Sequence, residues 1–177
     1  NQITLAKPEI VIHMAAQALV LESYENPIET YQTNLMGTVN ILNAIKDSPS
    51  VKVFINVTSD KCYENKGDPR AFKEDDALGG IDPYSTSKAC SELITSSYRS
   101  SFNSDVAIAT ARAGNVIGGG DWACNRIIPD FIKKINQKQK LSIRNPTAIR
   151  PWQFVLEPLS GYLVLAERLF LKGTDFS

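Results

Sequence analysis

Val51-Lys-Val-Phe-Ile-Asn-Val57 is a continuous apolar run that ends directly in the polar sequence Thr58-Ser-Asp-Lys-Cys-Tyr63. A short run rich in β-branched residues and followed by polar residues is typical of a buried strand in a parallel sheet. Two other segments, Glu9 to His13 and Val106 to Ala111, have the same character. We therefore predict three parallel strands in these segments.

Helical patterns separate the predicted strands. Apolar residues recur with helical spacing from Glu29 to Lys46, after the start signal Asn26-Pro27, and a second helix is predicted from about Pro83 to Phe102. Strands that alternate with helices are the signature of an α/β fold, so we expect a Rossmann-like parallel sheet with flanking helices. Two more helices are expected at residues 129–138 and 158–171, and a long surface loop is expected at residues 65–82.

The composition excludes several classes of protein. A chain of 177 residues with 43% hydrophobic residues can bury a core, which excludes intrinsic disorder. Nineteen basic residues balance nineteen acidic ones, so a nucleic-acid partner is not expected. No apolar run approaches the roughly 18 residues of a membrane span, and the first residues lack the layout of a signal peptide. We expect a soluble cytoplasmic protein without a membrane partner.

The cysteines point to neither disulfides nor a metal. Cys62, Cys90 and Cys124 are an odd number, widely spaced, and form no Cys-x-x-Cys pair. This pattern argues against a disulfide framework and against a zinc site. We expect reduced thiols that mostly fill packing positions, and no bound metal.

A tyrosine and a lysine stand four residues apart in Tyr84-Ser-Thr-Ser-Lys88. That spacing is about one helical turn, so the phenol and the ammonium lie on one helix face. A nearby positive charge is expected to lower the phenol pKa from its usual value of about 10, which would make Tyr84 a usable general base. The alternative is a Tyr-Lys pair on a solvated face, and the spacing alone leaves both open.

Three polar side chains follow the central predicted strand directly. Ser59 could hydrogen-bond the same hydroxyl that Tyr84 deprotonates, and Asp60 could protonate a leaving group. Lys61 could accept a proton if its neighbours depress its pKa. An elaborate turn, or a plain surface ion pair between Asp60 and Lys61, remains the alternative.

The end of the first predicted strand, His13-Met-Ala-Ala-Gln17, is a candidate ligand contact. His13 is the only histidine of the chain, and a lone histidine after a strand is more often a structural group than a catalyst. We assign it a positional role. Ala15 and Ala16 are more important for ligand binding than His13, because small residues let a ligand approach the backbone closely.

Candidate diphosphate contacts follow the third predicted strand. Arg112-Ala-Gly-Asn-Val-Ile-Gly-Gly-Gly-Asp121 is a glycine-rich turn whose Asn115 amide suits polar contacts with a diphosphate. Arg126 and Arg150 could each clamp a phosphate, because a guanidinium presents a fork of donors. A flexible glycine loop and solvated arginines are the alternatives.

Together these motifs resemble the extended short-chain dehydrogenase/reductase superfamily. His13-Met-Ala-Ala16, Asn34-Leu-Met-Gly-Thr-Val-Asn40, Tyr84-x-x-x-Lys88 and Arg112-x-Gly-Asn115 match the order and spacing of its fourth to sixth strands. Within the superfamily the sequence is most similar to the CDP-glucose 4,6-dehydratases, because Asp60-Lys61 stands where dTDP-glucose and GDP-mannose dehydratases usually have Asp-Glu. Further matching stretches lie at residues 78–85, 115–122, 150–153 and 155–158, although Phe154 stands where this family usually has a histidine.

The resemblance implies an NAD-dependent dehydration of a nucleotide-linked hexose, CDP-D-glucose, to a 4-keto-6-deoxy sugar nucleotide. It implies that Tyr84, supported by Lys88 and Ser59, deprotonates the sugar 4-hydroxyl while the C4 hydride passes to NAD. Lys61 would remove the C5 proton, where relatives use Glu, and Asp60 would protonate the departing 6-hydroxyl. The implied NAD contacts are His13, Ala15, Ala16, Tyr84 and Lys88, and the implied nucleotide-sugar contacts are Asn115, Arg126 and Arg150.

The resemblance also implies a domain division. Residues 1–122 would be a partial NAD-binding domain that carries the catalytic residues, and residues 123–177 a partial substrate-binding region. The family opens with a Gly-x-x-Gly-x-x-Gly turn that meets the NAD pyrophosphate, whereas the first glycine here is Gly37. We therefore expect a fragment that begins at the family's fourth strand, folds poorly alone because its first strand is an exposed edge, and is inactive alone.

Other readings stay open at this point. A sugar-nucleotide 4-epimerase of the same superfamily needs the Tyr/Lys pair but not Asp60 and Lys61. A non-catalytic sugar-nucleotide-binding protein on this fold needs no activated phenol, and fold alone does not decide between them. A homo-oligomer, dimer or tetramer, is expected through the helices from Glu29 and from Pro83, as in relatives, although the same apolar faces could pack on the sheet.

Overall fold

A three-stranded parallel sheet lies at the centre of the computed structural model, which describes residues 2–67, 70–102 and 105–176. Its strands are β1 (Ile10–His13), β2 (Val53–Val57) and β3 (Ala107–Ala111), in that spatial order. Ile10 lies opposite Val53 in the register of the first pair, and Val53 lies opposite Ala107 in the second. The three predicted strands are confirmed, with starts that differ by one or two residues.

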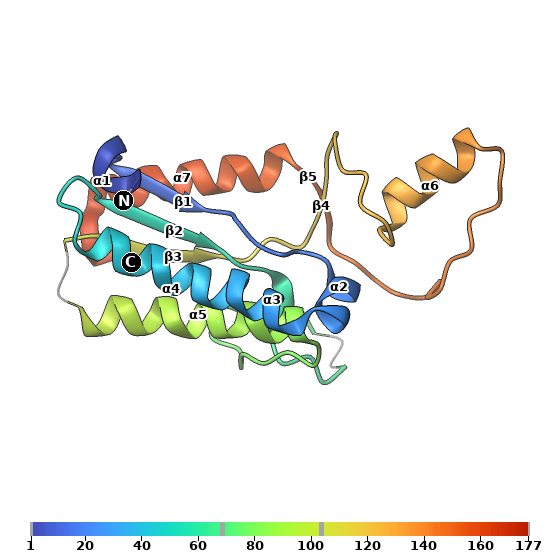
Figure 1. Ribbon diagram of the computed structural model, residues 1–177, viewed down its shortest axis with the longest axis horizontal. Helices are drawn as coiled ribbons and strands as arrows, with labels where there is room; N and C mark the ends of the chain where they lie inside the picture. Colours follow the sequence, from blue (N-terminus) through green and yellow to red (C-terminus); the bar gives the residue numbers. More distant parts are fainter. Residues whose placement is uncertain (1, 68–69, 103–104, 177) are drawn as a thin grey trace.

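Helices cover both faces of this sheet (Figure 1). Helices α4 (Gly37–Lys46) and α5 (Pro83–Ser101) lie on one face, and α7 (Leu156–Lys172) lies on the other. Successive side chains of a strand point to opposite faces. Phe54 therefore packs with Leu42 beneath α4, whereas its neighbour Ile55 packs with Leu169 of α7. Two cores, one on each face, result from the alternation along β2.

The helix predicted from Glu29 to Lys46 is present but not uniform. It runs as α3 (Pro27–Tyr31), a π-helical turn η1 (Gln32–Met36) and then α4. Single π-helical turns often occur at functional sites, and this one buries Asn34. Apolar periodicity does not reveal such a local change of hydrogen-bond register.

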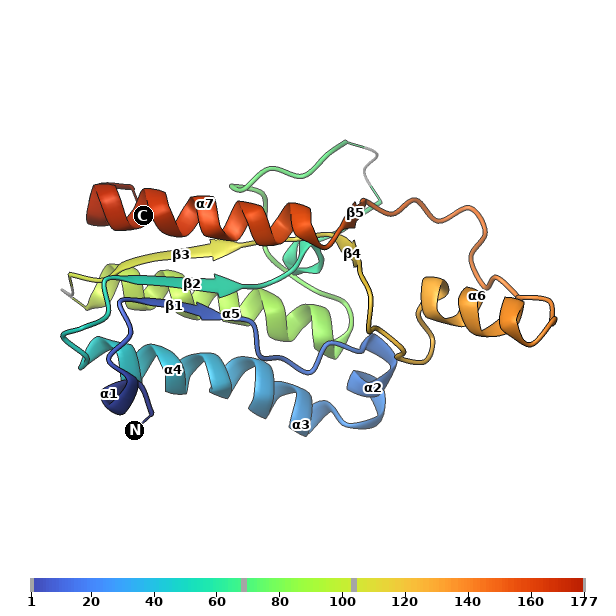
Figure 2. The ribbon, with the colours of Figure 1, turned by 90° about the horizontal axis from the view of Figure 1, so that it is seen from above.

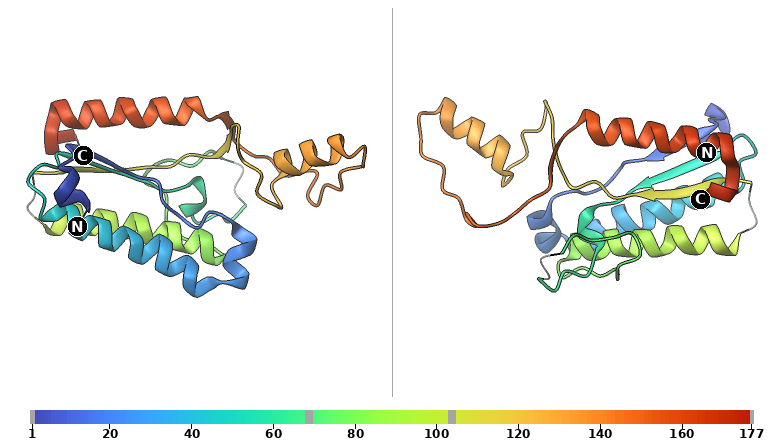
Figure 3. Two further views of the ribbon diagram at one scale, coloured as in Figure 1. Left: turned by 45° about the horizontal axis from the view of Figure 1, so that its top comes forward. Right: turned by 180° about the vertical axis from the view of Figure 1, so that it is seen from behind.

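A second, two-stranded parallel sheet lies beyond the carboxyl ends of β1 to β3. Its strands are β4 (Asn115–Ile117) and β5 (Trp152–Phe154), and α6 (Ile127–Asn136) lies on the connection between them. Figures 2 and 3 show that α6 stands away from the body of the molecule. The sequence predicted α6 but not the two strands, since three-residue strands leave too short a pattern.

Short helical elements complete the described chain. Helix α1 (Gln2–Ala6), helix α2 (Val20–Glu25) and the 3₁₀ turns η2 (Asp60–Cys62) and η3 (Gly173–Phe176) were not predicted. The predicted surface loop at residues 65–82 is largely exposed, and its residues 68–69 lie outside the described part. The predicted division at residue 122 stays a prediction, and α7 packs on the same sheet as α4 and α5.

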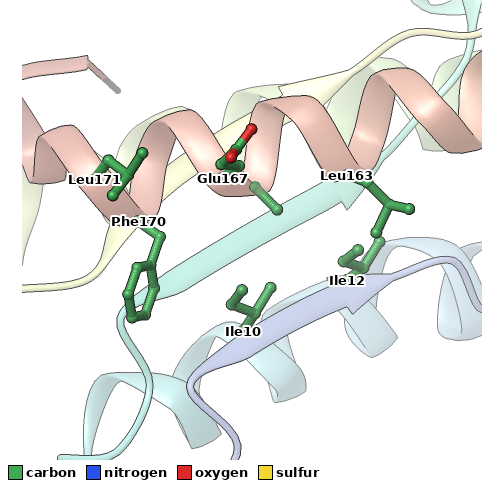
Figure 4. Close-up of a pocket in the computed structure, with 7 residues that line it drawn as sticks. Ile10, Ile12, Leu163, Glu167, Phe170 and Leu171 are labelled. Carbon is green, nitrogen blue, oxygen red and sulfur yellow. The ribbon is translucent and has the colours of Figure 1, made fainter.

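An apolar groove of about 330 Å³ lies between β1 and α7 (Figure 4). Ile10 and Ile12 of β1 face Leu163, Phe170 and Leu171 of α7 across it. β1 is the edge strand of the described sheet, and Ile10 is 41% exposed. The groove contains none of the candidate catalytic side chains. Among the described helices, none has the length and apolar character that crossing a membrane requires.

Candidate active site

The chain leaves β2 through a fixed polar turn. Thr58 and Ser59 are buried, and η2 follows them at once. The Ser59 hydroxyl caps this turn by accepting a hydrogen bond from the Lys61 backbone N–H at 3.2 Å. The Asp60 N–H donates to the Ala113 carbonyl, just after β3, at 3.1 Å. Two strand ends thus fix the backbone that carries Asp60 and Lys61.

The first turn of α5 is held equally firmly. Asp82 caps the helix by accepting hydrogen bonds from the Ser85 N–H at 2.9 Å and the Ser85 hydroxyl at 2.6 Å. Pro83 occupies the first helical turn, where a missing N–H has no cost. The Tyr84 N–H donates to the Ser23 hydroxyl of α2 at 3.1 Å. These contacts fix where the phenol of Tyr84 enters the site.

Gly80 allows the preceding loop to lie directly against the start of α5. A Cβ at this position would lie 2.4 Å from the Ser85 carbonyl carbon and 2.4 Å from the Thr86 nitrogen. Because both are backbone atoms, we expect Gly80→Ala to displace the helix start and lower stability by about 1–3 kcal/mol, as overpacking does. Gly79→Ala is the matched control, since its Cβ meets nothing closer than 3.4 Å. Thermal unfolding of both variants checks this, and equal midpoints would contradict it.

The phenol of Tyr84 lies within hydrogen-bond reach of Ser59, whereas the predicted contact of Ser59 with a substrate hydroxyl stays a prediction. Tyr84 is 8% exposed, and its pKa is raised above the usual value because burial disfavours the phenolate. A hydrogen bond with Ser59 opposes that rise, and the Asp60 carboxylate adds to it. The prediction of a lowered pKa was wrong for this state of the protein, because the spacing of Tyr84 and Lys88 says nothing about how deeply the phenol is buried.

Lys88 is buried one turn further along the same helix face. The residue is only 6% exposed, and its Nζ donates to the Val57 carbonyl at the end of β2, at 3.1 Å. Burial lowers the pKa of Lys88 to about 8, against an opposing effect of Glu92. At neutral pH the group therefore still carries its charge. The alternative of a solvated Tyr-Lys face is wrong, because both residues are buried.

Asp60 and Lys61 lie partly exposed between these groups. The Ser59 hydroxyl donates to an Asp60 carboxylate oxygen at 3.1 Å. Among the described residues the ion pairs do not include one between Asp60 and Lys61. Both side chains are partly exposed at the carboxyl end of β2.

His13 is the last residue of β1 and lies opposite Asn56 of β2 in the sheet register. Its Nε2 lies 3.5 Å from the Thr38 hydroxyl, and its ring stacks on Phe54 with centroids 6.4 Å apart. Burial first and the Lys88 charge second lower the pKa of His13, so it is neutral at physiological pH. Ala15 is exposed and Ala16 half-buried in the loop that follows. Contacts of these three residues with a cofactor stay a prediction.

The expected nucleotide contacts lie at the second sheet. Asn115 pairs with Trp152 in the β4–β5 register, which brings it near Arg150, two residues before Trp152. Arg150 is exposed. Arg126 forms an ion pair with Asp121 at 2.8 Å, and its charge lowers the pKa of Tyr84, which places it on the catalytic side. Binding of a diphosphate by these residues stays a prediction.

The sequence analysis missed a buried acid on α5. Glu92 is 4% exposed and forms an ion pair with Arg112 at 2.9 Å. It follows Lys88 by four residues, so helical spacing alone could have placed it on the same face. Cys62, by contrast, is the packing residue that was expected: burial raises its pKa to about 12. No group of three or more potential metal ligands occurs among the residues that the structure describes.

Comparison with protein families and curated proteins gives consistent matches. The family model described as GDP-mannose 4,6 dehydratase matches residues 1–168. The chain is 53% identical, over its full length, to a CDP-glucose 4,6-dehydratase of Salmonella typhimurium, and covers 51% of that protein. It is 31% identical to the human dTDP-D-glucose 4,6-dehydratase, over 96% of the chain and 49% of that protein. The chain therefore spans about half the length of the curated relatives it matches.

Solved structures show the same fold. A dTDP-glucose 4,6-dehydratase of Bacillus anthracis, in complex with NAD, superposes with a TM-score of 0.81 at 24% identity, over 94% of this chain and 50% of that one. A UDP-glucose 4-epimerase of Thermotoga maritima gives a TM-score of 0.85 at 22% identity, over 94% and 54%. Dehydratases and epimerases thus share this architecture, and the predicted α/β fold is confirmed.

Proposed function

This chain belongs to the family of GDP-mannose 4,6-dehydratases, and we propose that it carries the catalytic part of an NAD-dependent 4,6-dehydratase acting on CDP-glucose. The observation that carries the proposal is the meeting of Ser59 and Tyr84 beside the Lys88 helix face, with Asp60 and Lys61 on the same strand end. The 53% identity to a CDP-glucose 4,6-dehydratase supports the cytidine nucleotide.

The first step is oxidation of the sugar at C4. Tyr84 takes the proton of the 4-hydroxyl, and Ser59 donates a hydrogen bond to the same oxygen as it becomes a ketone. The Lys88 ammonium lies on the Tyr84 face of α5 and favours the phenolate by its charge. Because burial raises the pKa of Tyr84, proton transfer depends on the groups that oppose this rise, which include the hydrogen bond with Ser59 and the charge of Arg126.

The second step is elimination of water. A ketone at C4 acidifies the C5 proton, which the free amine form of Lys61 removes, while the protonated carboxylic acid form of Asp60 gives its proton to the departing 6-hydroxyl. The C5–H and C6–O bonds break, a C5–C6 double bond forms, and water leaves. Placing the acid and the base on adjacent residues of one fixed turn lets both act on neighbouring carbons. Hydride return to C6, with a proton to C5, then gives the 4-keto-6-deoxy sugar.

The described residues fit the nicotinamide end of NAD, which when bound supplies the reversible hydride acceptor for C4 oxidation. Lys88 and Tyr84 provide polar groups at the carboxyl end of β2, where ligands of parallel sheets bind. Ala15 leaves the backbone after β1 accessible, because it is small and exposed. His13 holds that loop from below through Thr38 and Phe54.

The wider biological setting belongs to the same proposal. We expect Asn115, Arg126 and Arg150 to hold the nucleotide diphosphate, in a cytoplasmic enzyme without nucleic-acid or membrane partners. We also expect a homo-oligomer, either dimer or tetramer. Exposed apolar side chains on the outer helices, Ile28, Met36 and Leu93, support such an interface, being 73%, 48% and 58% exposed.

Lys61→Ala separates the dehydratase from the epimerase of the same fold. In the complete natural polypeptide that carries this sequence, we expect the variant to form the 4-keto-6-deoxy product about 10²-fold more slowly, because the C5 base is missing. Lys66→Ala is the matched control, an exposed lysine that pairs with a surface glutamate at 3.1 Å. Mass spectrometry of the product measures the loss of water. Wild-type conversion of CDP-glucose to its 4-epimer without that loss would contradict the proposal.

A further inference from the structure

The buried ion pair between Glu92 and Arg112 joins the ends of two strands to α5. One Glu92 oxygen accepts a hydrogen bond from the Thr58 hydroxyl, at the end of β2. The other accepts from the Thr110 hydroxyl of β3 at 2.8 Å and from Arg112 Nη2 at 2.9 Å. The side chains of the pair are 4% and 16% exposed, so the carboxylate is held by three donors away from solvent.

Arg112 reaches from this pair to the loop that follows the catalytic turn. Its guanidinium lies over the ring of Tyr63, 4.8 Å from the centroid, and Tyr63 also contributes a side-chain hydrogen bond. The Tyr63 ring also stacks on the ring of Phe72, with centroids 4.6 Å apart and an interplanar angle of 3°. Arg112 Nη1 donates to the Glu74 carbonyl at 2.9 Å. One guanidinium therefore contacts α5, the residue that follows η2, and the surface loop at Glu74.

The residues that the pair touches flank the catalytic turn on both sides. Thr58 immediately precedes Ser59, Asp60 and Lys61, and Tyr63 follows directly after η2. Between them the turn is supported by backbone hydrogen bonds, such as the bond from the Gly79 N–H to the Cys62 carbonyl at 2.9 Å. Glu92 thus anchors this turn at its start, and Arg112 anchors it at its end.

A buried ion pair such as Glu92–Arg112 is better suited to positioning neighbouring residues than to stabilising the fold. A buried ion pair loses most of its Coulomb attraction to desolvation, and apolar residues of the same volume often serve stability as well or better. What a guanidinium adds is a planar fork with fixed directions for its hydrogen bonds and a flat face for an aromatic ring. Such directions fix a turn to within a fraction of an ångström, as acid–base transfer requires.

We propose that the Glu92–Arg112 ion pair is a positioning device that holds Asp60 and Lys61 at the substrate through Thr58 and Tyr63. The inference rests on the proposed function, since it concerns the elimination half of that reaction. Tyr84 and Lys88 lie earlier on α5 and have their own supports at Asp82, Ser23 and Val57. Tyr63 follows η2 and Ser59 precedes it, so loosening Tyr63 affects Asp60 and Lys61 more than the groups of the oxidation step.

The test uses Tyr63→Leu and Arg112→Lys in the complete natural polypeptide with NAD and CDP-glucose. Oxidation at C4 is followed by the absorbance of reduced nicotinamide in single turnovers, and C5 deprotonation by uptake of deuterium from heavy water. We expect both variants to oxidise C4 within about threefold of the wild-type rate, and to take up deuterium at C5 at least about 10-fold more slowly. Tyr63→Leu keeps the ion pair intact, so it stays informative if Arg112→Lys does not fold.

Tyr98→Leu is the matched control, because it removes a ring from an aromatic pair at the far end of α5, where Tyr98 and Phe102 lie 4.8 Å apart. We expect it to leave the ratio of the two rates unchanged. Equal losses of both rates in Tyr63→Leu, or no loss at all, would overturn the positioning role while the proposed function stands. A wild-type protein that turns over CDP-glucose without exchange at C5 would overturn the function, and the positioning role with it.

Discussion

Tyr84→Phe is expected to slow turnover of CDP-glucose by about 10⁴-fold, the upper range for loss of a general base. The variant keeps the ring, which fills the same buried space, and loses only the hydroxyl that accepts the C4 proton and interacts with Ser59. Neither oxidation nor elimination proceeds without that proton transfer, because elimination requires the C4 ketone. The loss therefore exceeds the loss for Lys61→Ala, in which C4 oxidation survives.

The pH profile gives this prediction a second readout. Only the phenolate of Tyr84 can accept a proton, and burial raises the pKa of the phenol. We therefore expect kcat/KM of the wild-type protein to rise from neutral pH to about pH 8, where the Lys88 ammonium begins to lose its charge, and Tyr84→Phe to lose this rise. Tyr24→Phe, at an exposed tyrosine of α2, should keep both the rate and the profile. If the Tyr84→Phe variant kept the wild-type profile, another group would be the base.

The strands and the placement of Tyr84 and Lys88 on one helix face could be predicted from the sequence because both depend on local patterns. The apolar run of β2 ends abruptly at Thr58, and a four-residue spacing sets Tyr84 and Lys88 on one helix face whatever surrounds them. Ser59 could be placed with them because the carboxyl ends of parallel strands meet at one edge of the sheet.

The remaining features depend on contacts between distant segments, which local patterns do not encode. The pairing of β4 with β5 brings Asn115 to Trp152, which is far away in the sequence. Arg112 meets Glu92 and Tyr63 only because β3 lies beside β2 and the loop folds over both. The direction of the Tyr84 pKa shift follows from burial, which is a property of the whole packing. A spacing rule can place two side chains on one helix face, but it does not give their ionisation.

Lys88→Met is expected to lose activity and gain stability. The buried charge of Lys88 supports catalysis, but its burial lowers the free energy of unfolding. The pKa of Lys88 is about 8 in the folded protein, against 10.5 for a free lysine side chain. The unfolded chain therefore binds more protons than the folded one between these two values. The destabilisation by the charge is complete below about pH 8, shrinks as the pH rises, and vanishes above about pH 10.5.

The magnitude follows from the same two values. A shift of this size corresponds to about 3 kcal/mol, since one pKa unit is about 1.4 kcal/mol. Methionine has a similar length and removes the charge, but it cannot form the hydrogen bond to the Val57 carbonyl. The loss of this bond reduces the expected gain in stability by about 1 kcal/mol. We thus expect Lys88→Met to be about 2 kcal/mol more stable than the wild type at neutral pH, with turnover lowered about 10³-fold.

Denaturant unfolding at several pH values checks the sign as well as the size. The stability advantage of Lys88→Met should be constant below about pH 8 and shrink between about pH 8 and pH 10.5, because the folded wild type sheds its buried proton over that range before the unfolded chain does. Lys52→Met, at an exposed lysine just before β2, should show no such trend. A difference between Lys88→Met and wild type that is independent of pH would mean that the Lys88 ammonium is not destabilised by burial. In that case Lys88 would keep its charge to higher pH, and the loss of turnover in Lys88→Met would report a charge that supports Tyr84 without a cost in stability.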